Sequence, residues 1–423
     1  MTGIRSSYTD KLAFFGRNTP QQLVAAYGSP LYVYNEKILR RACRDLLQLS
    51  AHPGFRVNYS AKANSNPSLL RIIREEGCLV DAMSPGELRM DMDAGFLREQ
   101  ILYVCNNVSE AELKNAVVHG LLVSVDSLAQ LDLYGRLNKG GKVMLRFNPG
   151  IGAGHHQKVV TAGENTKFGV SPEELDEARA LLAGHGLTLI GLNQHIGSFF
   201  MTPDGYLDAV DWLLAFAAAL RPEEFACLDV LDFGGGFGIP YRKYENEARL
   251  DMNALGKGIH ERISAFAAQT GYRGHFYVEP GRYVVAECGL LLGTVHAVKS
   301  NAGRRYAGTD LGFNTLMRPV LYNAYHDIEI YRVDGKNDAG SLPQSVVGNI
   351  CESGDILAEN RELPEIRIGD ILGVLDAGAY GFAMCSNYNL RLRPAEILIN
   401  ADGSHRLIRR RDSLDDLMRN VDV

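Results

Sequence analysis

The sequence predicts a (β/α)₈ barrel of the TIM type with a mostly antiparallel C-terminal β-domain, so the expected fold class is α/β plus all-β. Two observations predict this fold. Eight short apolar runs alternate with amphipathic helical stretches from about residue 55 to residue 280, which is the order of elements in a parallel barrel. After Gly281 the pattern changes to strand-like runs with little helical interruption, which is typical of an antiparallel β-domain.

The barrel strands are predicted from runs of apolar and β-branched residues that end in or near Gly, Asn, Asp, Ser or Pro. The eight runs are Phe55–Ser60, Leu79–Ala82, Ile101–Val104, Leu121–Val125, Lys142–Phe147, Leu187–Gln194, Cys227–Phe233 and His275–Val278. Helices are expected between them near residues 67–76, 85–94, 109–118, 127–137, 172–184, 205–220 and 253–269. Several of these helices begin with Ser or Pro at capping positions, which supports the assignment.

The second domain is predicted from strand-like runs that continue almost to the end of the chain. They are Val284–Val298, Arg305–Thr309, Asp327–Val333, Ser345–Ile350, Asp370–Leu375, Glu396–Ile399 and His405–Arg409. A further strand, Pro30–Tyr34, precedes the barrel and could pair with either domain, and a short helix is expected at Ser413–Asn420. The predicted domains are a barrel over residues 36–282 and a β-domain of residues 1–35 plus 283–423.

Composition and charge exclude several kinds of partner. The 423 residues include 44 Lys plus Arg and 50 Asp plus Glu, a net charge of −6 without a long single-sign block, so nucleic acid and anionic membranes are not expected partners. The most apolar stretches are shorter than the ~20 residues of a membrane span, and the N-terminus lacks an apolar signal sequence. Seven cysteines without a CxxC pair suit free thiols in a reducing cytosol. We therefore expect a cytoplasmic enzyme.

In a barrel of this type the active site lies just beyond the carboxyl ends of the strands. Lys62 follows the first predicted strand, and His195 follows the sixth. The seventh strand leads into three glycines, residues 234–236, and the eighth into Glu279 and Arg282. The loops after strands seven and eight commonly bind a phosphate, which the backbone N–H groups of a glycine run suit well. A phosphate site opposite a lysine suggests pyridoxal 5′-phosphate (PLP).

PLP requires three kinds of group, and the strand ends supply each of them. The Lys62 amine suits covalent attachment, Glu279 suits the pyridine nitrogen, whose proton makes the ring an electron sink, and His195 could lie flat against the ring. Taken singly, each residue has an ordinary explanation: a solvated lysine, a tight glycine turn, a core histidine. Their joint position at the strand ends favours the cofactor.

Seven motifs extend this pattern over the chain, in order, from about residue 29 to residue 400. They are Tyr59–Asn64, Thr166–Gly169, His195–Ser198, Gly234–Tyr241, Glu279–Arg282, Cys351–Asp355 and Ala379–Gly381. Together they resemble the diaminopimelate decarboxylase family. This family belongs to the PLP enzymes with an alanine-racemase-like barrel plus β-domain, a group that also contains ornithine, arginine and carboxynorspermidine decarboxylases.

The resemblance implies a role for each motif residue. It implies that Lys62 carries PLP, that His195 stacks on the ring and that Cys351 is the proton donor. The cofactor would also contact Ser198, Gly235, Gly236, Glu279, Gly281, Arg282 and Tyr380. The family forms homodimers with shared active sites, which implies that Cys351 and Glu352 reach in from the partner subunit.

The choice of substrate depends on the remaining polar groups. The segment Met317–His326 resembles the part of the family that binds the distal end of diaminopimelate, and the implied substrate-binding residues are Arg282, Arg318, Tyr322, Glu352 and Tyr380. Two arginines and a tyrosine suit a second carboxylate, and Glu352 suits an ammonium group. We therefore expect decarboxylation of meso-2,6-diaminopimelate at its D-centre to L-lysine and CO₂, the last step of lysine biosynthesis.

Other functions stay open from the sequence. One is a related PLP decarboxylase acting on a polyamine precursor (carboxynorspermidine, ornithine) or on a carrier-bound amino acid. Another is a catalytically silent PLP-fold regulatory binding protein, and a third is an amino acid racemase. The joint presence of Lys62, Glu279 and Cys351 argues against a silent protein, and Cys351 in place of a clear tyrosine base argues against a racemase.

Two further features suggest no additional chemistry. The pair His155–His156 hints at a metal, but no Cys or carboxylate stands at ligand spacing, so we expect no metal. Tyr388 and the Arg391–Arg393 stretch are expected to be loop and interface residues rather than ligands.

Overall fold

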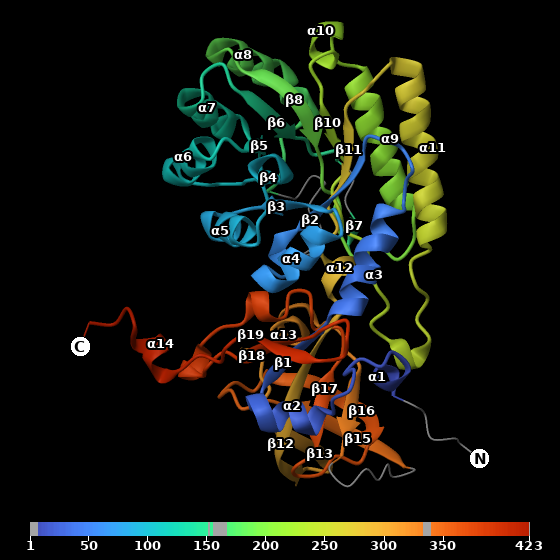
Figure 1. Cartoon of the computed structure of the whole chain (residues 1–423), viewed down its shortest axis with the longest axis vertical. Coiled ribbons are helices and arrows are strands. Elements are labelled where there is room, and N and C mark those ends of the chain that lie inside the picture. Colours follow the sequence, from blue (N-terminus) through green and yellow to red (C-terminus); the bar gives the residue numbers. More distant parts are fainter. Residues whose placement is uncertain (1–6, 151–152, 155–166, 333–339, 423) are drawn as a thin grey trace. The chain divides into compact units, whose positions relative to one another are not determined.

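A computed structural model describes residues 7–150, 153–154, 167–332 and 340–422 of the chain. The chain forms two compact units (Figure 1). The barrel unit comprises Arg40–Ile239 and Ala248–Val284, and the β unit comprises Met1–Leu39, Pro240–Glu247 and Val285–Val423. This division differs from the predicted limits mainly at residues 240–247.

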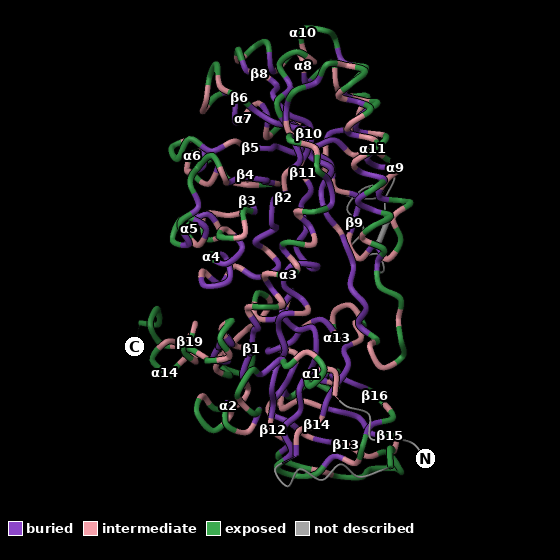
Figure 2. Tube along the Cα trace, turned by 45° about the vertical axis from the view of Figure 1, so that its right-hand side comes forward, coloured by how far each residue is buried: buried purple, intermediate pink, exposed green. Residues whose placement is uncertain are grey.

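The strands of the barrel unit close into a ring in which all pairs are parallel, in the order β10-β11-β2-β3-β4-β5-β6-β8. Their bounds are β2 Phe55–Ser60, β3 Leu79–Ala82, β4 Ile101–Val104, β5 Leu122–Val125, β6 Lys142–Arg146, β8 Thr188–Asn193, β10 Val230–Asp232 and β11 His275–Val278. All eight correspond to predicted strands, so the expected barrel is confirmed. The buried tube segments of Figure 2 include most of these strands, as is typical of a parallel sheet that is covered on both faces.

Helices surround the barrel where the sequence predicts them. Their bounds are α4 Pro67–Glu75, α5 Pro85–Asp93, α6 Glu110–Val118, α7 Leu128–Leu137, α8 Leu175–His185, α9 Asp204–Ala218 and α11 Met252–Thr270, with the shorter α10 Pro222–Phe225. Side-chain caps set their starts: the hydroxyl oxygen of Ser84 accepts from the N–H of Glu87, and that of Ser109 accepts from the N–H of Glu112. Helix α3, Glu36–Leu47, was not predicted.

The β unit contains a nine-stranded, mostly antiparallel sheet, as expected. Its strands are β1 Leu31–Asn35, β12 Gly289–Asn301, β13 Arg304–Thr309, β14 Ile328–Tyr331, β15 Ser341–Val347, β16 Ile356–Pro364, β17 Ile371–Val374, β18 Ala395–Ile399 and β19 His405–Arg409. Among the described residues of this sheet, only the pairs β1–β18 and β13–β15 are parallel. Because β1 pairs with both β12 and β18, the early strand belongs to this unit.

The sequence prediction was wrong at several places in this unit. The run predicted to begin at Val284 first completes a short helix, α12 Arg282–Val285, and β12 starts only at Gly289. Strand β16 was not predicted. The unit also carries the short helices α1 Tyr8–Lys11, α2 Pro20–Tyr27, α13 Arg318–Tyr322 and α14 Leu414–Met418.

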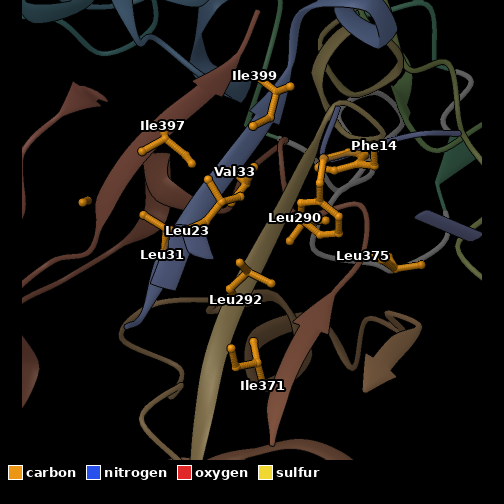
Figure 3. Packing of buried hydrophobic residues seen from close by; sticks show 12 residues of the cluster. Phe14, Leu23, Leu31, Val33, Leu290, Leu292, Ile371, Leu375, Ile397 and Ile399 are labelled. Atoms are coloured by element: carbon orange, nitrogen blue, oxygen red, sulfur yellow. The ribbon is translucent and has the colours of Figure 1, made fainter. Parts of the chain in front are cut away.

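Strand β1 lies at the centre of the β-unit core (Figure 3). Leu31 and Val33 of β1 lie beside Leu292 and Leu290 of the neighbouring β12, and all four are almost fully buried. The remaining members are Phe14, Phe15, Leu23, Ile371, Leu375, Ala395, Ile397 and Ile399. Burial of a side chain of this size contributes about 1.5–3 kcal/mol to stability. This cluster therefore stabilises the unit that contains Arg318, Cys351 and Tyr380.

No helix in the described part of the chain is both long enough and apolar enough to cross a membrane.

Candidate functional site

Lys62 lies on a single 3₁₀ turn, Ala61–Ala63, that directly follows β2. Asp81 of the adjacent β3 accepts hydrogen bonds from the Ser60 hydroxyl and the Ala61 N–H, both at 2.9 Å. Burial raises the pKa of the Asp81 carboxyl, while the positive charge of Lys62 and these two donors lower it. Asp81 therefore fixes the turn that presents Lys62.

His195 follows β8 and is tied to the glycine run after β10. The Gly235 N–H donates to Nδ1 of His195 at 3.1 Å, so Nε2 carries the proton in the neutral ring. Burial and the positive charges of Lys62 and Arg146 hold the pKa of His195 well below its usual value. His195 is therefore an uncharged, flat ring at the carboxyl end of the barrel.

The glycine run 234–236 leaves no room for side chains. A Cβ on Gly235 would lie 1.8 Å from the Glu279 carbonyl oxygen. Gly236 has φ +118°, and a Cβ there would lie 2.3 Å from Cε2 of Phe200. Within the described residues the Gly236 N–H has no hydrogen-bond partner, so the run offers a backbone donor suited to a phosphate oxygen.

Glu279 directly follows β11 and is a buried carboxyl with 5% of its surface exposed. Its Oε1 has no hydrogen-bond partner among the described residues. Burial, and then the carboxyls of Asp232 and Asp81, raise the pKa of Glu279 well above its usual value, although Lys62 and Arg146 act in the opposite direction. Burial also raises the pKa of Asp232 to about 7. A protonated ring nitrogen is the kind of partner this orphaned carboxyl oxygen requires.

The turn from Glu279 to Arg282 is anchored at both ends. The Ser60 N–H donates to the Pro280 carbonyl at 3.1 Å, and Arg282 Nη2 donates to the Ser198 hydroxyl at 3.1 Å. The Arg282 guanidinium also lies 5.6 Å from the centre of the Phe199 ring. This geometry brings Ser198, Gly281 and Arg282 to the same barrel end.

The barrel-unit candidates thus follow β8, β10, β11 and β2, which are four consecutive strands of the barrel. They form the set Lys62, His195, Ser198, Gly235, Gly236, Glu279, Gly281 and Arg282. Their chemistry fits PLP: an amine, an unpaired buried carboxyl oxygen, a neutral ring and a glycine-lined backbone donor. Sequence reasoning missed Asp81, Asp232 and Arg146. The charge of Arg146 contributes to the pKa shifts of His195 and Glu279, and the carboxyls of Asp81 and Asp232 contribute to that of Glu279. Arg146 stands at the end of β6, a position that the rule of carboxyl strand ends could have found.

In the β unit, Arg318 begins α13 and is only 2% exposed. Its Nη1 donates to Nε2 of His326 at 2.7 Å, and its guanidinium carbon lies 4.6 Å from the centre of the Tyr241 ring. Tyr322, the last residue of the same helix, is partly exposed. Tyr380 is also partly exposed and has φ 55°.

Cys351 and Glu352 lie on an exposed turn between β15 and β16. The Cys351 N–H donates to Oδ1 of Asn389 at 3.0 Å, and Nδ2 of Asn389 donates to the Cys351 sulfur at 3.2 Å. The Tyr388 hydroxyl donates to Oε1 of Glu352 at 2.6 Å. The sequence predicted Tyr388 to be a loop and interface residue rather than a ligand, and it gave no reason to single out Asn389.

Comparison with known proteins matches residues 36–286 to the family model described as "Pyridoxal-dependent decarboxylase, pyridoxal binding domain". The diaminopimelate decarboxylase of Methanothermobacter thermautotrophicus is 39% identical over 406 residues, 95% of this chain and 94% of that protein. The enzyme of the same name from Escherichia coli K12 is 35% identical over 412 residues, 94% of each protein. The chain belongs to the diaminopimelate decarboxylase family.

Solved structures of the family agree with this membership. The crystal structure of diaminopimelate decarboxylase from Helicobacter pylori complexed with L-lysine has a TM-score of 0.86 and 28% identity, and the match covers 95% of this chain and 98% of that one. Both predictions, the family and the fold of barrel plus β-domain, are confirmed. The family's pyridoxal-binding domain also confirms PLP as the cofactor.

Two other features lie outside the candidate group. A cavity of about 650 Å³ opens at the amino ends of the barrel strands, where its lining includes Asn58, Lys142 and His275 but none of the candidate residues. Among the described residues no group of three or more His, Cys, Asp or Glu is arranged to hold a metal. The His155–His156 pair lies outside the described residues.

Proposed function

We propose that this protein decarboxylates meso-2,6-diaminopimelate at its D-centre to L-lysine and CO₂, with PLP as cofactor. The observation that carries the proposal is the shared barrel end of Lys62, His195 and Glu279, in a chain similar over nearly its whole length to enzymes named diaminopimelate decarboxylase. Buried Arg318 supplies the cation that a second carboxylate requires.

PLP, when bound, supplies an electrophilic aldehyde for amines and an electron sink for the electron pair left by departing CO₂. We propose that Lys62 holds the cofactor covalently, that His195 lies against its ring and that Glu279 keeps its ring nitrogen protonated. Ser198, Gly235, Gly236, Gly281, Arg282 and Tyr380 would bind the rest of the cofactor. The neutral state of His195 suits stacking, because an imidazolium would repel a protonated cofactor ring.

The substrate would be held at two ends. Arg282, Arg318 and Tyr322, assisted by Tyr380, would bind the distal carboxylate, and Glu352 would bind the distal ammonium. The Cys351 thiol would then deliver a proton to the carbon that has lost CO₂. Ornithine, lysine and carboxynorspermidine have a single carboxylate and would leave the arginines without an anion, a mismatch that typically costs about 10⁴-fold in discrimination.

We further propose a homodimer with shared active sites, in which Cys351 and Glu352 serve the barrel of the partner. Their exposed position in the single chain supports this assembly. Mixing two inactive variants, Lys62→Ala and Cys351→Ala, should then restore up to about a quarter of the wild-type activity, because half of the dimers are mixed and each has one intact site. Absence of any restoration would contradict sharing. The seven free cysteines support a cytoplasmic location.

The substrate is tested by incubating the PLP-loaded protein separately with meso-, LL- and DD-diaminopimelate, L-lysine, L-ornithine and carboxynorspermidine. CO₂ and the amine product are quantified in each case. We expect L-lysine from the meso isomer by a wide margin. Preference for a substrate with one carboxylate would refute the roles of Arg318 and Tyr322, and turnover of none would favour the carrier-bound or regulatory alternative.

The role of Lys62 needs a separate control. Lys62→Ala should abolish both turnover and the visible absorbance that borohydride removes from a lysine-bound cofactor. Lys257→Ala is the matched control, because Lys257 is a lysine of the same unit whose side chain is 75% exposed on α11. An active Lys62→Ala variant would refute covalent attachment at this residue.

A further inference from the structure

The turn that carries Cys351 and Glu352 is held by one short loop, residues 388–391. Asn389 contacts Cys351 twice, accepting from its N–H at 3.0 Å and donating to its sulfur at 3.2 Å. Tyr388 donates to Glu352 at 2.6 Å, and Arg391 Nη2 donates to the Asn349 carbonyl at 2.9 Å. Three hydrogen-bonding side chains of one loop therefore fix three residues of the other.

The backbone of this loop is strained. Asn389 has φ 55° and ψ 26°, and Leu390 follows with φ 52°, so two successive non-glycine residues adopt the left-handed conformation. Asparagine tolerates this region, whereas leucine rarely adopts it. The Leu390 side chain is 75% exposed and gains no burial in return. Strain of this kind persists only where surrounding contacts enforce it, and it is concentrated at functional sites.

The contacts suit the chemistry of the two residues they hold. An N–H donor aimed at a sulfur fixes the side chain of Cys351 and binds more strongly once the sulfur is negatively charged. A hydroxyl that donates to one oxygen of Glu352 fixes the orientation of that carboxylate and leaves the other oxygen available for an ammonium group. The Tyr388 ring is itself stacked on Phe313, with 5.6 Å between ring centres.

We propose that Asn389 and Tyr388 are positioning residues of the active site. Asn389 holds the Cys351 thiol and stabilises the thiolate that remains after proton delivery, and Tyr388 orients Glu352 towards the substrate ammonium. In the proton step the S–H bond breaks, a C–H bond forms at the carbon that has lost CO₂, and a proton from water restores the thiol. This inference rests on the proposed function, in which Cys351 and Glu352 have these tasks.

Asn389→Gly tests the first role, because glycine accepts the left-handed backbone and removes only the amide. We measure the purified, PLP-loaded variant in the assembly state in which it is isolated. We expect kcat for meso-diaminopimelate to fall about tenfold to a hundredfold, while KM stays within about threefold of the wild-type value. In D₂O the deuterium incorporated into lysine should lose its single configuration, since the proton no longer comes from a fixed donor. A merely structural role would not change that configuration.

Two further variants sharpen the test of Asn389. Asn246→Gly is the matched control, because Asn246 is exposed, has φ 56° and should behave like the wild type. Asn389→Asp keeps an acceptor for the Cys351 N–H but places a negative charge beside the sulfur, so it should be at least as slow as Asn389→Gly. Wild-type kcat and configuration in Asn389→Gly would overturn the proposal, as would full activity in Asn389→Asp.

Tyr388→Phe tests the second role, because it keeps the stack on Phe313 and removes the hydroxyl. We expect KM to rise about tenfold, while kcat stays within about twofold of the wild-type value. This combination indicates weakened substrate binding. An unchanged KM would overturn this role. If the wild type releases no lysine, both the proposed function and this inference fail. If it is active and the three variants match it, only the inference fails.

Discussion

Arg318 Nη1 donates to Nε2 of His326 across 2.7 Å, and the His326 ring has a second fixed partner. Its Nδ1 donates to the Leu375 carbonyl at 2.7 Å, so the ring is held in the tautomer whose Nε2 accepts. The acceptor is thus a neutral ring, and Arg318 itself is only 2% exposed. The pair therefore presents a buried, oriented cation, which is what recognition of a carboxylate requires.

Replacing His326 should weaken substrate binding through Arg318. His326→Leu removes a hydrogen bond to a charged group, worth about 1.5–3 kcal/mol, so we expect KM for meso-diaminopimelate to rise about tenfold to a hundredfold. His326→Gln offers an amide oxygen as acceptor and should recover part of the loss. Steady-state kinetics check both variants, with the melting temperature as a control for folding. Equal KM values in His326→Leu and the wild type would contradict the orienting role.

Asp91 of α5 is a buried acid whose two carboxyl oxygens have no hydrogen-bond partner among the described residues. Burial, followed by the charges of Asp81 and Glu87, raises the pKa of Asp91 to about 9, against about 3.9 for an aspartate in water. Between these values the folded state binds more protons than the unfolded chain, so this residue lowers stability as the pH rises.

Asp91→Asn should remove this pH dependence. Relative to the wild type its free energy of unfolding should increase with pH from about 4 to about 9, by at most about 1.4 kcal/mol per pH unit. Urea unfolding at several pH values measures the difference. Asp93→Asn, on the exposed part of the same helix, is the control and should change little. Parallel pH curves for Asp91→Asn and the wild type would refute the interpretation.

The sequence sufficed for the barrel because each strand is a short apolar run beside a capped amphipathic helix. It also indicated Lys62, His195 and Glu279, since any side chain directly after such a strand lies at the same barrel end. Asp81 was missed because its task depends on the pairing of β2 with β3, which places it beside Ser60 and Ala61.

The parts that sequence reasoning missed lack a local signal. Strand β16 reads as a loop because most of its residues are polar or exposed, and it is held by pairing with β15. Asn389 and Tyr388 acquire their roles only when a loop far along the chain packs on the Cys351 turn. Such long-range contacts leave no periodic pattern in a single sequence.

Replacing Asp232 should shift the acid limb of the pH–activity profile. Its carboxyl raises the pKa of Glu279, so Asp232→Asn should lower that pKa and keep Glu279 ionised to lower pH. The acid limb of kcat/KM for meso-diaminopimelate should therefore move to lower pH. The profile of Asp208→Asn, an exposed acid of α9, serves as control. A limb that moves to higher pH, or stays in place, would contradict this coupling.

Lys243 attaches residues 240–247 to the β unit through a buried ion pair network. Its ammonium lies 2.8 Å from Glu287 and 3.3 Å from Asp376, and its side chain is 3% exposed. Burial opposes its charge, but the two carboxylates outweigh burial and raise the Lys243 pKa. Lys243→Met would remove the buried cation that faces both carboxylates, so we expect a loss of about 3–5 kcal/mol in the free energy of unfolding. Urea unfolding measures this loss, and Lys257→Met, at an exposed position, is the control. A loss below about 1 kcal/mol in Lys243→Met would show that the network contributes little to stability.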